Sequence, residues 1–136
     1  MRLLSIAALA VALGGSLPAA AANPKCPTTL PQDQLNECHA QAADETEKRL
    51  DGLLRELRRT LSNKNWSMMK ESHALWEKTR SYDCKVKASF VDGPVRSAVV
   101  NGCIEKLTRQ RMHQLRYYLC PRYDLTGQCD AEAAYE

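Results

Sequence analysis

The sequence predicts an all-α protein, a three-helix up-down-up bundle that disulfides hold together. Residues 32–93 contain no proline and only two glycines, Gly52 and Gly93. Apolar residues recur at spacings of three and four along three segments, and the period-two alternation typical of strands is scarce. Short polar or Gly-Pro connections separate these segments, and short connections make neighbouring helices antiparallel. The fold class follows from these three observations.

The first helix is expected to reach about Ser62. Two N-caps are open: Thr29, which forms a capping box with Gln32, and Asp33. Gly52 costs about 1 kcal/mol relative to alanine inside a helix, so close packing is the expected reason for it. The expected apolar stripe has a gap around Thr46 and consists of Leu35, Cys38, Ala42, Leu50, Leu53, Leu54, Leu57 and Leu61.

The second helix follows the polar turn 62–65, where either asparagine, Asn63 or Asn65, is expected to be the cap. Residues 91–94 end this helix, and the third helix is expected over 95–118. The expected inner face of the second helix holds Trp66, Met69, His73, Trp76, Arg80 and Cys84. The expected inner face of the third helix holds Val99, Cys103, Leu107, Met112 and Leu115.

The first 22 residues have the features of a secretory signal peptide. A positive start at Arg2 precedes an uncharged run over 3–13, and alanines at 20–22 offer a cleavage site before Asn23. The run is too short to cross about 30 Å of hydrocarbon, so stable membrane insertion is not expected. We therefore predict an exported protein, periplasmic or secreted. Its domains are a signal peptide 1–22, a helical domain 23–118 and a C-terminal tail 119–136.

The charge balance excludes two classes of partner. The net charge is +3, and it falls to +2 once Arg2 is removed with the signal. This value is too small to predict a nucleic acid or an anionic membrane as the partner. The expected partner is therefore a protein, and the oligomeric state is left open.

Six cysteines behind an export signal predict a disulfide framework that supplements a small core. Folding the helices back on each other brings Cys26, Cys38, Cys84 and Cys103 to one end of the bundle, where they are expected to form two bridges. Cys38–Cys84 with Cys26–Cys103 is slightly favoured over Cys26–Cys84 with Cys38–Cys103. Cys120–Cys129 is expected to close a loop in an irregular tail. No Cys-x2-Cys pair is present, so neither a metal nor another cofactor is expected.

No motif for catalysis is visible, so the chain is not expected to be an enzyme. The histidines are His39, His73 and His113. His73 lies on an inner face beside Trp76, where a core histidine with satisfied hydrogen bonds is expected rather than a general base. No activated nucleophile accompanies a histidine. No spacing singles out a carboxylate pair of the kind that hydrolyses glycosides.

The charges of the first helix are polarised. Acidic residues occupy its first part, from Glu37 to Asp51, and arginines 55, 58 and 59 its last turns, which complements the helix dipole. A solvated face is the simplest interpretation. The acidic part also offers a surface for a basic protein. The candidate contact residues are Asp44 and Glu45 there, and Asp92 in the turn between the second and third helices.

Three sequence elements resemble the LprI-like lysozyme-inhibitor family of small exported bacterial proteins, formerly a domain of unknown function. The second helix has Trp76-x3-Arg80-x3-Cys84, and the third has Cys103-x3-Leu107-Thr108-x2-Arg111-x3-Leu115. The Asp92-Gly93 turn lies between them, and Cys38 precedes Leu50-Asp51 by twelve residues. The resemblance covers about residues 26–118, and the combined spacing is fairly specific.

The chain departs from the family pattern at several positions. Members usually have glutamine where His73 stands and an aromatic residue where Thr79 stands. Their Asp-x2-Leu-Asn-x2-Tyr element is Glu47-x2-Leu50-Asp51-x2-Leu54 here, and their Gly-Gly-Ser turn is reduced to Asp92-Gly93-Pro94. The tail with Cys120 and Cys129 is an addition. These changes preserve helix chemistry, so the resemblance implies the family's helical fold.

The resemblance implies an exported binding protein that inhibits a lysozyme by occluding its cleft. The alternative is a periplasmic envelope module, structural or stress-related, that binds another protein without inhibiting lysozyme. The matching motif residues have the chemistry needed to hold three helices together. Reflecting the second helix onto the first about residue 63 places Arg80 beside Glu47, with Asp51 one turn away. We therefore predict an Arg80–Glu47 ion pair with a structural role.

Overall fold

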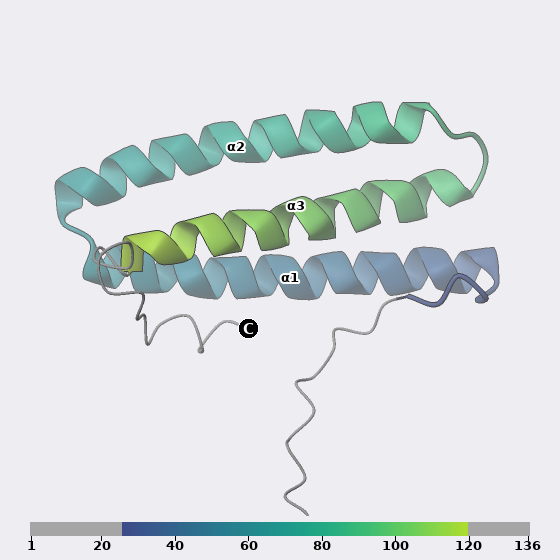
Figure 1. The fold of residues 1–136 in the computed structure, drawn as a ribbon, viewed down its shortest axis with the longest axis horizontal. Coiled ribbons are helices and arrows are strands. Elements are labelled where there is room, and N and C mark those ends of the chain that lie inside the picture. Colours follow the sequence, from purple (N-terminus) through teal and green to yellow (C-terminus); the bar gives the residue numbers. More distant parts are fainter. Residues whose placement is uncertain (1–25, 120–136) are drawn as a thin grey trace, which may run out of the picture.

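The structure is a computed structural model that describes residues 26–119. It contains three helices, α1 (Gln32–Thr60), α2 (Asn63–Ser89) and α3 (Val95–Leu119), and no strand in this range. Figure 1 shows α1 and α2 joined at one end of the molecule, and α2 and α3 joined at the other. The all-α, three-helix prediction is confirmed. The predicted signal peptide and the Cys120–Cys129 loop lie outside the described residues.

The helix starts differ from the predicted caps. The N-cap of α1 is Pro31, and no side chain caps it, so the predicted capping box at Thr29 and the Asp33 alternative are both wrong. The carbonyl of Pro31 accepts from the Leu35 N–H at 2.8 Å, and proline's fixed φ suits a helix start. Ser62, not an asparagine, caps α2, because its hydroxyl lies within reach of the third helical N–H, at Asn65.

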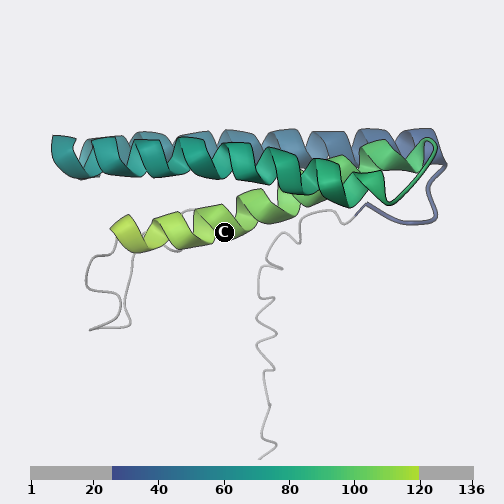
Figure 2. The ribbon, with the colours of Figure 1, turned by 90° about the horizontal axis from the view of Figure 1, so that it is seen from above.

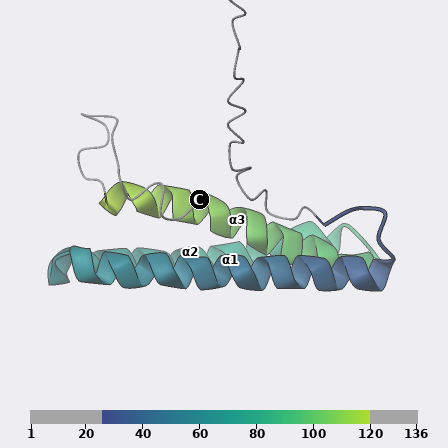
Figure 3. The same cartoon turned by 90° about the horizontal axis from the view of Figure 1, so that it is seen from below.

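The core forms where the three helices bring their apolar faces together. The buried cluster consists of Leu50, Leu53, Leu57, Met69, Met112 and Leu115. α3 packs against both other helices and most extensively against α1. Figures 2 and 3 show α3 inclined to the other two helices, from which it diverges toward its C-terminal end. The gap expected at Thr46 does not exist, since Thr46 is buried and its hydroxyl donates to the Ala42 carbonyl at 2.8 Å.

Two disulfides lie toward the end of the molecule where α2 meets α3. The structure pairs Cys26 with Cys38 and Cys84 with Cys103. The four cysteines are all bridged, as predicted, but both predicted pairings are wrong. The first reason for the error is that α2 packs against α3, so the inward Cys84 faces Cys103, with 5.5 Å between their Cα atoms. The lead-in also turns back, with the Leu30 N–H donating to the Pro27 carbonyl, which leaves Cys26 beside Cys38 on α1.

Candidate functional site

The motif residues of α2 and α3 gather around the ring of Trp76. The guanidinium carbons of Arg80 and Arg111 lie 4.9 and 5.6 Å from the Trp76 ring centroid. The ring of His73 stacks on Trp76, with 5.3 Å between the centroids. Arg111 also donates to the Ser72 hydroxyl at 3.4 Å. Two cations and two aromatic rings therefore form one layer between α2 and α3, a cation–π arrangement.

Arg80 joins all three helices. Its Nη2 lies 2.7 Å from the Glu47 carboxylate on α1, and its Nη1 donates to the Thr108 hydroxyl on α3 at 2.6 Å. Thr108 in turn donates to the Ile104 carbonyl at 2.7 Å. The Arg80 side chain is only 11% exposed, whereas that of Glu47 is 45% exposed. The predicted ion pair with Glu47 is confirmed, and Thr108 is a partner that the sequence argument did not identify.

The other motif residues lie in or beside the core. Leu50 and Leu115 belong to the buried cluster, and Leu107 is half-buried. Asp51 is on the exposed side of α1. The three leucines are therefore placed to hold the helices together, whereas Asp51 is not.

His73 is buried, but its ring nitrogens make no hydrogen bond within residues 26–119, contrary to the expectation of a satisfied histidine. Its Nε2 lies 3.7 Å from the Glu77 carboxylate. Burial lowers the pKa of His73 below its ordinary value of 6.5; Arg111 and Arg80 lower it further, while Glu77 and Asp51 oppose the shift. His73 is therefore a neutral ring at neutral pH.

Nothing in the described part of the chain assembles a metal-binding group of three or more His, Cys, Asp and Glu side chains. The four cysteines in this part are joined in disulfides, so none offers a thiolate nucleophile. Among residues 26–119, no helix is both long and apolar enough to cross a membrane.

The three predicted contact residues are all exposed, but they lie on two elements. Asp44 and Glu45 are on α1, and Asp92 is in the turn between α2 and α3. The Asp44 carboxylate lies 2.6 Å from Lys48 Nζ, and this contact raises the pKa of Lys48. Asp92 lies 3.7 Å from Arg96. Asp44 and Asp92 are therefore each partly neutralised by a cation one helical turn away, and Glu45 is exposed beside Asp44.

Sequence reasoning missed a second apolar surface on α2. Five large apolar side chains of this helix and its C-cap are more than half exposed: Met68, Leu75, Tyr82, Val86 and Phe90. Their spacing places them on a face of α2 distinct from the one that carries His73 and Trp76. The signal is present in the sequence as this spacing of seven and four residues, which defines a second apolar face beside the one that carries Trp76.

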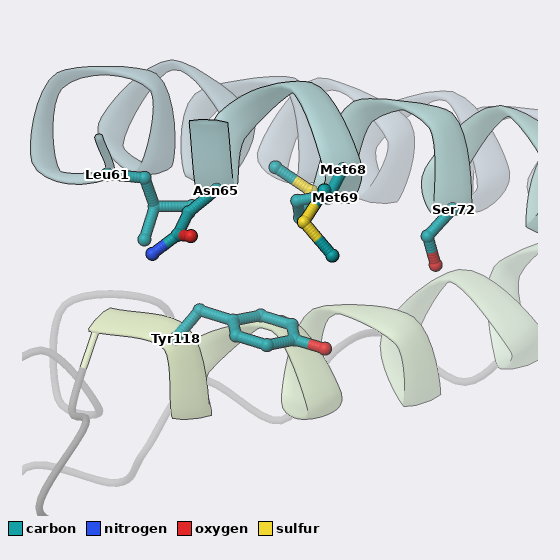
Figure 4. Close-up of a pocket in the computed structure, with 6 residues that line it drawn as sticks. All are labelled: Leu61, Asn65, Met68, Met69, Ser72 and Tyr118. Atoms are coloured by element: carbon teal, nitrogen blue, oxygen red, sulfur yellow. The ribbon is translucent and has the colours of Figure 1, made fainter. Parts of the chain in front are cut away.

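A groove of about 310 Å³ opens between the start of α2 and the end of α3. Figure 4 shows the Tyr118 ring on α3 across from the two methionines on α2. The lining residues are Leu61, Asn65, Met68, Met69, Ser72 and Tyr118. A shallower depression lies near Asp51 and Trp66. The groove is lined by apolar and hydrogen-bonding side chains and by no carboxylate, whereas the depression is lined mainly by charged side chains, three of them arginines.

The fold and these surfaces define a small, disulfide-bonded helical domain with large apolar side chains exposed on α2. The chain matches the family model described as Lysozyme inhibitor LprI over residues 25–115. It therefore belongs to the LprI lysozyme-inhibitor family, and the resemblance noted in the sequence is confirmed. Comparison with curated proteins and with solved structures gives no match.

Proposed function

We propose that the protein is an exported inhibitor that binds a lysozyme and occludes its cleft. The observation that carries this proposal is the family match, which spans residues 25–115 and so includes all three helices up to Leu115. A protein that occludes a cleft needs a stable shape and an exposed contact surface but no chemistry of its own. The two disulfides and the helical core supply the stable shape.

Part of the proposed contact surface is the acidic face of α1. Asp33, Glu37 and Asp44 are exposed and, at spacings of four and seven, share one side of the helix, and Glu45 is exposed beside them. Many lysozymes are strongly basic, so a local acidic surface attracts them even though the inhibitor as a whole is slightly positive. Asp92 extends this acidic character to the turn after α2.

Export is the second part of the proposal. The disulfides favour an oxidising compartment, and the first 22 residues have the composition of a signal peptide. N-terminal sequencing of protein recovered from the periplasm or the medium is expected to begin at Asn23. A cytoplasmic protein that starts at Met1 would contradict this part.

The test of inhibition is the initial rate at which a basic lysozyme lyses a cell-wall suspension, measured with increasing amounts of the mature protein. Inhibition is expected, and it should weaken as salt shortens the screening length from about 10 Å at 0.1 M to about 3 Å at 1 M. Reversing Asp44 and Glu45 to lysine should weaken it further.

The matched control compares two single changes of equal charge. Glu45→Lys on α1 should weaken inhibition, whereas Glu71→Lys at an exposed position of α2 should not. Circular dichroism should show that both variants are folded. If inhibition persists unchanged in the α1 variants and at high salt, the contact surface lies elsewhere. If no lysozyme is inhibited, the envelope-module alternative replaces this proposal.

A further inference from the structure

The end of the molecule where α2 meets α3 carries an exposed aromatic side chain on a short turn. We call residues 90–94 the tip. Phe90, the C-cap of α2, is 83% exposed, and Asp92 projects fully into solvent. Tyr82 and Val86 precede Phe90 at four-residue spacing and are 70% and 57% exposed. An apolar strip on α2 therefore runs toward the tip, which lies at one extreme of the elongated molecule (Figure 1).

The tip is held by contacts to all three helices. The Val91 N–H donates to the Ala88 carbonyl, and the Arg96 N–H donates to the Gly93 carbonyl. The Arg96 side chain donates to the Val91 carbonyl at 3.2 Å, and the Asn36 amide on α1 donates to the Pro94 carbonyl at 3.0 Å. These bonds fix the turn before any partner binds.

The backbone and a disulfide brace the tip further. Gly93 has φ +75°, a conformation that favours glycine and allows the tight reversal. The Cys84–Cys103 bridge joins α2 to α3 behind the turn. A preorganised surface loses little conformational entropy on binding, and aromatic side chains are enriched in the cores of protein interfaces.

We propose that the tip enters the lysozyme cleft, with Phe90 as its apolar anchor. This inference rests on the proposed function and names the surface that performs it. The tip lies at one extreme of the elongated molecule (Figure 1), with Phe90 exposed on a tight turn, so it can enter a concave site. A lysozyme cleft contains a pair of catalytic carboxyl groups. Residues 85–96 hold three cations, Lys85, Lys87 and Arg96, against one acid, Asp92, so this end of the molecule carries a net positive charge that complements that acidic cleft.

Charge also favours a lysozyme over a second copy of the same chain as the partner of the tip. Two copies that met tip to tip would bring two segments of net positive charge together, and like net charges disfavour such an interface. The acidic face of α1 begins near the tip, because Asn36 on the first turns of α1 contacts Pro94. The tip can therefore occupy the acidic cleft while α1 faces the basic surface beside it.

The experiment measures the inhibition constant of Phe90→Ser against a lysozyme that the wild-type protein inhibits. The constant should rise at least tenfold, the effect expected when an interface anchor is removed. Leu75→Ser is the matched control, because Leu75 is 60% exposed on α2 and lies four helical turns from Phe90. It should inhibit like wild type, and Phe90→Trp should retain most of the inhibition. Both serine variants should melt like wild type, because both side chains are exposed.

Photo-crosslinking gives a second measurement that does not depend on the serine variants. Phe90→p-benzoylphenylalanine should crosslink to lysozyme peptides that border the cleft, and the same replacement at Leu75 should not. Crosslinks only to peptides remote from the cleft would overturn the inference.

The outcomes distinguish this inference from the proposed function. If wild type inhibits and Phe90→Ser inhibits equally well, the tip is not the anchor and the function stands. If Phe90→Ser changes only the sedimentation behaviour of the protein, the tip joins copies of the chain, and the inference is again overturned. If the wild-type protein inhibits no lysozyme, the proposed function itself fails.

Discussion

Arg80 is the residue whose polar contacts connect all three helices. Its guanidinium contacts Glu47 on α1, Trp76 on α2 and Thr108 on α3. It is nearly buried, whereas Glu47 is half-exposed, so the two members of the pair are not equivalent. Loss of Glu47 leaves a buried cation without its carboxylate, while loss of Arg80 leaves a carboxylate that water can still reach.

We predict that Glu47→Ala and Arg80→Ala both lower the free energy of unfolding, by about 2–4 kcal/mol, near the range known for broken buried pairs. Arg80→Ala acts through lost packing and hydrogen bonds, and Glu47→Ala through the stranded charge. Chemical denaturation of both variants and of the double variant measures this. The double variant should lose less than the sum, and additive effects would contradict direct coupling.

The same variants separate a structural role from a contact role for Arg80. Any loss of lysozyme inhibition by Arg80→Ala should follow the unfolded fraction. A variant that melts like wild type but no longer inhibits would make Arg80 a contact residue.

His73 makes stability depend on pH. Burial holds its pKa below 6.5 in the folded state, so the unfolded chain binds more protons in the range below 6.5. Stability from this group is therefore present above about pH 6.5 and is lost as the pH falls toward the folded-state pKa, by at most about 1.4 kcal/mol per pH unit. The groups that face it are Glu77, Arg111, Arg80 and Asp51.

We predict that His73→Phe, which keeps a ring against Trp76, reduces the loss of stability between pH 7 and pH 5. Urea denaturation at several pH values measures it. His113→Gln is the control, because His113 is exposed on α3. An unchanged pH dependence in His73→Phe would assign the acid sensitivity to other groups.

The glycines inside α1 and α3, Gly52 and Gly102, differ in how closely a neighbouring helix approaches them. A Cβ at Gly52 would meet only the Arg55 side chain at 3.7 Å, so the close packing expected from the sequence is absent there. A Cβ at Gly102 would lie 3.3 Å from His39 Nδ1, which shows that α3 approaches α1 closely at that point. The sequence could not distinguish these two glycines, since the difference depends on what the neighbouring helix presents.

Gly52→Ala should therefore stabilise the protein by about 0.5–1 kcal/mol, through helix propensity alone. The melting temperature should rise by a few degrees. Gly102→Ala is the comparison and should gain less or lose stability, because His39 must move. Thermal unfolding followed by circular dichroism measures both, and equal gains would contradict the close approach of α3 to α1.

Helix boundaries and inner faces were largely predictable, but the relations between helices were only partly so. Apolar spacing placed Leu53, Leu57 and Leu115 in the core. Reflecting the second helix onto the first, which matches residues at the same height in the bundle, predicted the Arg80–Glu47 pair. The same reflection failed for Cys38 and Cys84. Two residues at the same height in the bundle can face different helices, and Cys84 faces α3 rather than α1. Which helix each face meets depends on the inclination of α3, and that inclination is not a property of any local pattern.

For the molecule as a whole, the disulfide pairing is the most direct check of the arrangement. A non-reduced proteolytic digest should contain the linked peptides Cys26–Cys38 and Cys84–Cys103. Each bridge closes a loop of fewer than 20 residues and should contribute about 3 kcal/mol. A Cys38–Cys84 or Cys26–Cys103 peptide would show that α2 packs differently from the structure.

The exposed strip from Met68 to Phe90 was the largest feature that sequence reasoning did not identify. Phe90 and Tyr82 are recognisable as apolar residues, but a three-helix bundle has only one interior, and the face with Met69 and His73 already fills it. Contiguous exposed apolar patches often mark interaction sites, and the part of this strip nearest the tip, with Tyr82 and Phe90, is the part for which we propose a partner.

Steady-state kinetics of a lysozyme on a soluble oligosaccharide is the measurement that tests cleft occlusion most directly. If the protein occupies the cleft, increasing amounts should raise the apparent KM while kcat stays constant, because substrate and inhibitor exclude each other. Phe90→Ser should require a higher concentration to produce the same rise. A fall in kcat at constant KM would show binding away from the cleft and would contradict the proposed mechanism.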